Sequence, residues 1–465
     1  MSLWDGGEFV AATGGRALGE QPGSVSGISI DTRTLQSGDA FFAIAGDRFD
    51  GHDFASQAMR AGASAIVISE ERGIAFGHLQ VPKIVVPDVL KALENAGRAA
   101  RARTEAGIAA VTGSVGKTTT KEMLRTALGA SGPTHAAVAS FNNHWGVPLT
   151  LSRMPRDAAF GVFEIGMNHP GEITPLVGMV SPHVAAITRI APAHLGHFDS
   201  VQEIAKAKAE IFTGLGEGGV AVLNRDDDYY EFLHREAAAQ GVGLFVTFGT
   251  HAEADVRSSV SAGEQRAGIS VAGTNYEMNL PLRGTHNATN AACAIAVATS
   301  LGVGPEAAIK ALEAMPPVSG RGTIERLRVA GGEITLIDES YNANPVSMAA
   351  ALDVLAGLPN DGAGRRIAVL GDMRELGKFS HDMHADLDRP VLNARPDVVV
   401  LVGEEIGPLA DRLDGKVEVY HRANVDAAAP LLGSLLRPND IVMLKASNGT
   451  GLGRLAQMLR DQTEA

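Results

Sequence analysis

The 465-residue chain is poor in several features that would otherwise define its class. It has a single cysteine, Cys293, which excludes disulfides within the chain and suits a reducing cytosol. This cysteine falls in an apolar helical pattern, which favours a buried small side chain over a nucleophile. No apolar run approaches the roughly 20 residues of a membrane span, and the first residues lack a signal-peptide pattern. We therefore expect a cytoplasmic protein without stable membrane insertion.

The chain is not basic, since 40 Lys and Arg face 53 Asp and Glu for a net charge of −13. This balance argues against a general nucleic-acid binder. It does not exclude phosphorylated ligands, because local cations, backbone N–H groups and metal ions hold those. We find no internal repeat and no low-complexity segment. The length predicts about three domains.

The organising motif is Val-Thr-Gly-Ser-Val-Gly-Lys-Thr-Thr at residues 111–119. It follows a predicted strand over 107–111 and precedes a predicted helix over 120–128, an order typical of a phosphate-binding loop. In such a loop Lys117 reaches the outer phosphates and the Thr118 hydroxyl holds Mg²⁺. Val111 stands where the usual motif has its first glycine, so the loop is a shortened variant; a chance glycine-rich turn is the alternative. The predicted phosphate contacts are Gly113, Ser114, Val115, Gly116, Lys117, Thr118 and Thr119.

The alternation of strand and helix patterns predicts an α/β fold in three domains, over 1–85, 86–316 and 317–465. A Pro-Pro-Val-Ser-Gly hinge at residues 316–320 separates the last two. The first domain has no Gly-x-Gly-x-x-Gly, which excludes the usual dinucleotide-binding fingerprint. In that domain Asp31, Thr32 and Arg33 follow a predicted strand; they suit either a diphosphate or uracil clamp or a surface ion pair.

Two candidate metal ligands follow strands of the central domain. Glu164 lies near the carboxyl end of a predicted strand over 160–165, where a carboxylate is costly unless it is paired or bound to a metal. His194 follows a predicted strand over 184–190. A lone histidine is more often structural, but near a phosphate loop and a strand-end glutamate it is a candidate ligand.

The predicted helix over 201–212 carries one lysine on its apolar stripe. Lys208 falls on the face of Ile204 and Ile211, whereas Lys206 lies about 200° away around the helix and faces solvent. A lysine aimed into the core needs a partner or a changed chemistry. The pattern alone favours an ion pair or a side chain that reaches back to solvent. Carbamylation by CO₂ is the other possibility, and it would turn the ammonium into a carboxylate-like Mg²⁺ ligand.

Further candidate site residues lie in the second half of the chain. Asn287 and Asn290 share one face at a helix start and suit either a purine edge or helix capping. Polar loops over 338–345 and 371–377 follow predicted strands of the third domain, at the edge where a site is expected in a parallel sheet.

Together these stretches resemble the Mur ligase family, over nearly the whole chain. The resemblance rests on the short loop 112–118, on Glu164, His194 and Lys208, on a Gly-x-His-Asn-x-x-Asn run ending at Asn290, and on Arg321. It implies a UDP-binding first domain, a P-loop ATPase domain with a mainly parallel sheet, and a Rossmann-like last domain. Stretches at 140–146, 164–169, 340–345 and 370–377 are similar to members that add D-alanyl-D-alanine.

The resemblance implies an ATP-dependent ligase of peptidoglycan precursor synthesis, with UDP-N-acetylmuramoyl-tripeptide and D-alanyl-D-alanine as substrates and an acyl phosphate as intermediate. Its catalytic groups would be Lys117, Glu164, His194 and Lys208, with one Mg²⁺ on Thr118 and a second on Glu164, His194 and carbamylated Lys208. By the same resemblance ATP contacts fall to Asn287, Asn290, Arg321, Asp338 and Tyr341; the UDP end to Asp31, Thr32 and Arg33; and the muramoyl-peptide to Asn142 and Asn143. We expect a monomer.

Other readings remain open at this point. Family members that add a diamino acid usually carry Asp-Asn-Pro-Arg, which this chain lacks; a ligase acting on folate or an amino-acid chain, and a nucleotide switch, are further alternatives. One motif also departs from the family. Asn448 in Lys-Ala-Ser-Asn stands where an arginine is usual, and Arg454 is a candidate replacement.

Overall fold

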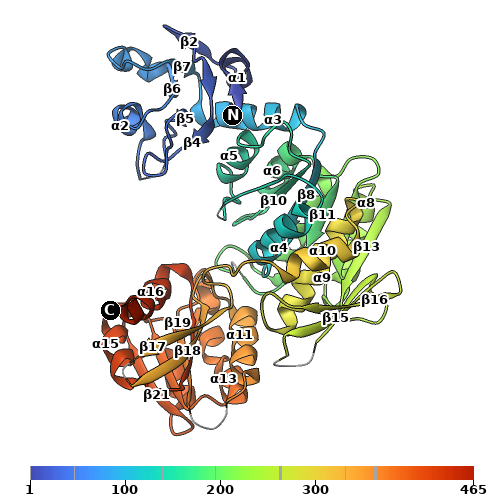
Figure 1. Ribbon diagram of the computed structural model, residues 1–465, viewed down its shortest axis with the longest axis vertical. Coiled ribbons are helices and arrows are strands. Elements are labelled where there is room, and N and C mark those ends of the chain that lie inside the picture. Colours follow the sequence, from blue (N-terminus) through green and yellow to red (C-terminus); the bar gives the residue numbers. More distant parts are fainter. Residues whose placement is uncertain are drawn as a thin grey trace.

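The computed structural model describes residues 2–46, 48–138, 140–193, 195–260, 264–329, 331–360 and 364–464. Figure 1 shows three α/β domains in chain order: a small blue one, a central one from cyan to yellow, and an orange-to-red one. This architecture confirms the predicted α/β class with three domains. Within the described ranges no helix is long and apolar enough to cross a membrane.

The first domain is built on a five-stranded sheet in the order β2-β7-β6-β5-β4. All its neighbours run parallel except β2, which is antiparallel to β7. The strands are β2 (Arg16–Leu18), β4 (Gly27–Ser29), β5 (Asp39–Phe42), β6 (Ala65–Ser69) and β7 (Lys83–Val86), and β1 (Trp4–Asp5) pairs separately with β3 (Ser24–Val25). The helices are α1 (Gly6–Thr13), α2 (Ala55–Arg60) and the 3₁₀ segments η1 (Gly51–Phe54) and η2 (Glu70–Phe76).

Helix α3 (Val89–Ala102) joins the first two domains. Its apolar residues recur at helical spacing, and Leu93 and Ala96 are buried in one core with Phe9 and Phe42 of the first domain. The helix therefore completes the N-terminal core, whereas the sequence pattern predicts that the central domain begins at residue 86. Helical spacing reveals that a face is buried but not which domain buries it.

The central domain has a nine-stranded sheet, β16-β15-β14-β13-β12-β11-β8-β10-β9, in which β8 to β14 are parallel and β15 and β16 form an antiparallel hairpin. Its strands are β8 (Gly107–Thr112), β9 (Thr134–Ala136), β10 (Phe160–Glu164), β11 (Val184–Ile187), β12 (Val220–Asn224), β13 (Leu244–Gly249), β14 (Val256–Ser259), β15 (Arg266–Val271) and β16 (Thr274–Asn279). Its helices are α4 (Lys117–Gly129), α5 (Gly146–Ser152), α6 (Ile173–Val180), α7 (Val201–Ala209), η3 (Glu210–Gly214), α8 (Tyr230–Ala239), α9 (Thr285–Ser300) and α10 (Pro305–Glu313).

Strand β8 shows why both faces of this sheet must be covered. Ile108 and Ala110 are buried in the core under α5, α6 and α7, whereas Ala109 and Val111 are buried in the core under α4, α9 and α10. A continuous apolar run is expected for a parallel strand that lies between two helical layers.

The third domain has a six-stranded sheet, β17-β18-β22-β19-β20-β21, parallel except for the edge strand β17. Its elements are β17 (Thr323–Val329), β18 (Gly332–Glu339), α11 (Pro345–Gly357), β19 (Arg366–Gly371), η4 (Gly377–Phe379), α12 (Ser380–Ala385), α13 (Asp388–Ala394), β20 (Val398–Val402), α14 (Gly407–Leu413), β21 (Glu418–Arg422), α15 (Val425–Leu435), β22 (Ile441–Lys445), η5 (Asn448–Thr450) and α16 (Leu452–Glu464). The sequence pattern predicts strands in this domain at 334–337, 366–370, 398–402 and 441–444, and it misses the two edge strands β17 and β21. The carboxyl ends of β18 and β22 meet those of β8, β10 and β11 around one cavity.

Candidate active site

The phosphate loop joins β8 to α4 and forms one wall of the cavity. Gly113 has φ +152°, and a Cβ there would lie 2.0 Å from the Thr188 hydroxyl oxygen, so the close approach requires glycine. Gly116, at φ +83°, precedes the first helical residue, Lys117. The helix therefore opens toward the cavity with no side-chain cap on its first turn, as suits an anion site.

Lys117 is held over this loop. Its Nζ donates to the carbonyl oxygen of Gly113 at 2.7 Å. Burial lowers the pKa of the Lys117 ammonium, while the charges of Glu164 and Glu375 raise it and Arg321 lowers it. The lysine thus lies where two carboxylates from different domains act on it.

Glu164, at the end of β10, lies beside the first residues of α4. The residue is 2 % exposed, and its carboxylate accepts hydrogen bonds from the Thr118 hydroxyl at 2.8 Å and from the Asn142 amide at 2.7 Å. These bonds offset the cost of burying the charge. A hydroxyl and a carboxylate side by side are hard oxygen donors, and they fit a Mg²⁺ ion bound together with substrate phosphates.

Lys208 on α7 is fully buried, and its Nζ has no hydrogen-bond partner among the residues described. Burial places the pKa of Lys208 well below the ordinary lysine value; repulsion by Lys117 adds to this and Glu164 opposes it. Lys206 is exposed, which confirms the assignment of helix faces. The two expectations from pattern alone are wrong: full burial excludes a side chain that reaches solvent, and no ion pair satisfies this amine within the described part of the chain.

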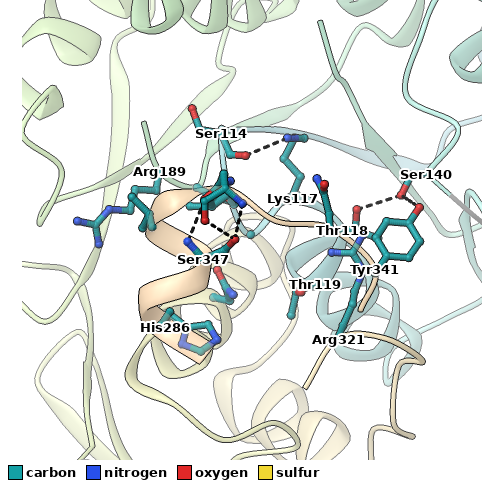
Figure 2. A pocket seen from close by; sticks show the side chains of 18 of the residues that line it. Ser114, Lys117, Thr118, Thr119, Ser140, Arg189, His286, Arg321, Tyr341 and Ser347 are labelled. Atoms are coloured by element: carbon teal, nitrogen blue, oxygen red, sulfur yellow. Dashed lines mark hydrogen bonds between the residues drawn. The ribbon is translucent and has the colours of Figure 1, made fainter. Parts of the chain in front are cut away.

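The third domain closes the cavity with Tyr341 and Arg321. The Tyr341 hydroxyl donates to Ser140 Oγ at 2.9 Å, and Ser140 Oγ lies 3.2 Å from Thr118 Oγ1. The Arg321 guanidinium lies over the Tyr341 ring, 4.0 Å from its centroid. Figure 2 shows these side chains beside Lys117 and Thr118 on one side of the pocket, opposite His286 and Ser347.

The other end of the cavity carries amide and imidazole groups. Asn287 and Asn290 both line it, and the Asn290 amide donates to Asn287 Oδ1 at 3.3 Å. Neither caps α9, which begins at Thr285 with no side-chain cap. His286 lines the same end, and burial lowers the pKa of its imidazole. Sequence reasoning did not select this histidine, although it lies in the Gly-x-His-Asn run. The whole cavity measures about 300 Å³.

Several predicted site residues lie elsewhere. Asp338 is 1 % exposed and binds Arg460 at 2.7 Å and the Ser340 hydroxyl at 2.6 Å, outside the cavity lining. Asn143 accepts the Gly146 N–H at the start of α5 and also lies outside the lining. His194 falls outside the described residues.

The Asp31–Arg33 turn lies in the first domain, outside the cavity lining. Arg33 Nη2 is 2.6 Å from Asp31 Oδ2, and the Arg33 side chain is 84 % exposed. This is the surface ion pair that the sequence left open as an alternative. Arg454, the candidate replacement for the missing arginine at 448, pairs with Asp426 and is likewise outside the lining.

Comparison with known proteins agrees with this arrangement. Models of the Mur ligase family match along the chain: its catalytic domain over 24–104, its middle domain over 111–298 and its glutamate ligase domain over 324–448. A UDP-N-acetylmuramoyl-tripeptide–D-alanyl-D-alanine ligase of Haemophilus influenzae is 33% identical over 453 residues, 96% of each chain. The chain belongs to the Mur ligase family. The resemblance drawn from the motifs is thereby confirmed.

Solved structures of Mur ligases share the whole architecture. MurF from Acinetobacter baumannii has a TM-score of 0.84, with 32% identity and 99% of both chains covered. A MurF ligase of Thermotoga maritima, solved in complex with ADP, has a TM-score of 0.77 at 26% identity, with 94% of this chain and 98% of that chain covered. The Mur ligase order of three domains therefore extends over the whole chain.

Proposed function

We propose that this chain is the ATP-dependent ligase that joins D-alanyl-D-alanine to UDP-N-acetylmuramoyl-tripeptide in peptidoglycan precursor synthesis. The observation that carries the chemistry is the cavity in which Lys117, the Thr118–Glu164 pair and Arg321 converge from two domains. The substrates are inferred from relatives that bear this name and align over nearly the full chain. Neither the diamino-acid ligase nor the folate-type ligase is favoured by those relatives.

The reaction joins two anions before it forms the amide. A carboxylate oxygen of the tripeptide attacks the γ-phosphorus of ATP, the bond from that phosphorus to the bridging oxygen breaks, and ADP leaves. The amine then attacks the acyl carbon, the bond to the phosphate oxygen breaks, and inorganic phosphate leaves while the amine proton passes to solvent. Lys117 and Arg321 reduce the repulsion between carboxylate and triphosphate, and the open start of α4 binds the phosphates.

Thr118 and Glu164 would hold Mg²⁺, which neutralises part of the triphosphate charge when it is bound. Glu164, His194 and Lys208 would hold a second ion. Lys208 would take part as a carbamate: its neutral amine nitrogen bonds to the carbon of CO₂ and releases one proton. The Lys208 amine is fully buried and has no hydrogen-bond partner in the described ranges, which supports this modification, because the carbamate would give that position a metal-binding oxygen.

The remaining assignments extend the same proposal. Asn287 and Asn290 would read the purine, and Tyr341 would contact the nucleotide from the third domain. Asn142 would contact the muramoyl-peptide from beside Glu164. The roles of Asp31, Thr32 and Arg33 toward UDP, of Asn143, and of Asp338 toward ATP stay predictions, as do the monomeric state and the cytoplasmic location.

A substrate-omission assay tests the function. We expect phosphate release only when ATP, UDP-N-acetylmuramoyl-tripeptide and D-alanyl-D-alanine are all present, with the pentapeptide product identified by mass. Sustained ATP turnover without the dipeptide would instead indicate a nucleotide switch. Parallel reactions with stem peptides ending in lysine or in diaminopimelate then determine which third residue the enzyme accepts.

A further inference from the structure

The segment that follows β11 is hydrogen-bonded to the phosphate loop at two consecutive residues. Thr188 lines the cavity and is 3 % exposed. Its hydroxyl donates to the Val115 carbonyl at 2.5 Å. The next residue contributes its backbone, since the Arg189 carbonyl accepts the Ser114 N–H at 2.7 Å. The two segments are therefore joined beyond the ends of the paired strands β8 and β11.

The direction of the Thr188 bond matters for an anion site. A loop that binds phosphates through its N–H groups must turn its carbonyl oxygens away from them, because the oxygens repel an anion. The Val115 carbonyl and the Gly116 N–H belong to one trans peptide unit, so they point in opposite directions. The bond to Thr188 therefore also fixes the direction of the Gly116 N–H, and Gly116 lines the cavity.

The end of β12 holds Thr188 in place. The Asn224 side-chain amide donates to the Thr188 carbonyl at 2.9 Å, and the Asp227 carboxylate accepts the Ile190 N–H at 2.6 Å. Asn224 is 3 % exposed and Asp227 is 7 % exposed, so water competes little for these bonds. The Thr188 hydroxyl is thus presented to the phosphate loop from a fixed backbone.

Lys117 also bonds to the phosphate loop, but its bond cannot hold the loop while substrate is bound. Lys117 Nζ donates to the Gly113 carbonyl at 2.7 Å. The proposed function assigns the same nitrogen to the outer phosphates, which compete for it. The Thr188 hydroxyl, by contrast, donates to a loop carbonyl and need not leave it when a phosphate binds.

We propose that Thr188 is a positioning residue that holds the phosphate loop in its anion-binding form. It acts through the Val115 carbonyl and hence through the direction of the Gly116 N–H. The inference rests on the proposed function, because it needs a nucleotide at this loop. It adds a residue outside the phosphate-loop motif that sets the affinity for that nucleotide.

The test compares Thr188→Val, which removes the hydroxyl and keeps the branched shape, with Thr188→Ser, which keeps the hydroxyl. We expect the Kd for MgADP, measured by calorimetry, to rise roughly 10-fold in Thr188→Val, as for one lost hydrogen bond. Thr188→Ser should bind MgADP as the wild type does. In ligation assays of Thr188→Val, the KM for ATP should rise while the KM for D-alanyl-D-alanine stays unchanged.

The matched control is Thr150→Val. Thr150 is likewise 3 % exposed, and its hydroxyl also donates to a backbone carbonyl, that of Gly146, at 2.8 Å. It lies on α5, outside the cavity lining. Both valine variants should lose stability in denaturant titrations, but Thr150→Val should keep the wild-type affinity for MgADP. Nucleotide affinity therefore separates a positioning role from a purely structural one.

An unchanged Kd for MgADP in Thr188→Val would overturn the inference, and so would equal losses of affinity in Thr188→Ser or Thr150→Val. If Thr188→Val does not fold, Thr188→Ala gives the same comparison with a smaller side chain. The binding measurement needs no acceptor. A wild-type protein that binds MgADP but forms no pentapeptide would refute the proposed function, while the same variants still decide the role of Thr188.

Discussion

The central domain buries one lysine beneath α4 and another beneath α7, and the two environments differ in one respect. Lys121 and Lys208 are both 0 % exposed. Lys121 Nζ donates to the Ala137 carbonyl at 2.7 Å and pairs with Glu122 at 2.6 Å, whereas Lys208 Nζ has no hydrogen-bond partner among the described residues. Burial is common to both lysines, so it does not identify a functional group. The lack of a hydrogen-bond partner among the described residues is what marks Lys208 as a candidate functional group.

The two buried lysines are expected to contribute differently to stability and to activity. A buried ammonium that is paired and hydrogen-bonded stabilises the conformation that satisfies it. A buried amine without a partner lowers the free energy of unfolding. Its presence therefore indicates a role in function rather than in stability. We therefore expect substitution at 121 to act mainly on stability and substitution at 208 mainly on activity.

The largest expected effect is on catalysis. Lys208→Ala should lower the ligation rate by roughly 10²- to 10³-fold, the scale of removing one preorganised electrostatic group from an active site. Short carboxylates such as formate or acetate should restore part of the rate, because they supply the oxygen that a carbamate would supply. A near-normal kcat for Lys208→Ala in steady-state assays would contradict a catalytic role for Lys208.

The next effect is on stability. Lys121→Met leaves the Ala137 carbonyl buried without its donor, while Glu122 keeps Arg125 at 2.9 Å. We expect a loss of about 1–3 kcal/mol in the free energy of unfolding, measured by denaturant titration. An unchanged midpoint would show that the Lys121 contacts carry no net stability.

A smaller effect of opposite sign is expected for Lys208→Met. Because no described residue pairs with this buried amine, replacing it by an apolar side chain of similar volume should leave stability unchanged or raise it by ~1 kcal/mol. The titration should be made in buffer freed of CO₂, so that the amine form is compared. Destabilisation as large as that of Lys121→Met would mean that the two buried lysines are equivalent after all.

The smallest effect is expected at Lys206, on the solvent face of the same helix α7. Lys206→Ala should change stability by less than about 0.5 kcal/mol and leave ligation unchanged. It is the matched control for Lys208→Ala, since both remove one lysine from one helix. Equal losses of activity at 206 and 208 would refute the argument from helix faces.

Residue patterns within single helices, strands and loops predicted much of the fold and of the candidate site. The helical period placed Lys208 inside and Lys206 outside, and the strand–loop–helix order located the phosphate loop. Strand-end reasoning brought Glu164 to the same cavity. These successes share a cause: each depends on the residues within one element and on the way parallel strands align their carboxyl ends.

The features that were not predicted depend on contacts between residues that are distant in the sequence. Asp338 follows the rule for a strand-end carboxylate, but it is bound by Arg460 on α16. Pattern alone gave Lys208 an ion pair because no sequence rule shows that a partner is absent. The loop over 371–377 was singled out, yet the left-handed backbone of Glu375 and the bond of its carbonyl to the Gly196 N–H follow from no local pattern.

The packing of helix α3 determines which domains unfold together. Its apolar face completes the core of the first domain while it packs against α5 of the central domain, and Arg103 just beyond it donates to the carbonyls of Leu3 and Met154. Heat should therefore melt these two domains as one cooperative block. The third domain follows a proline-rich hinge and has its own separate core clusters, so it is free to melt independently.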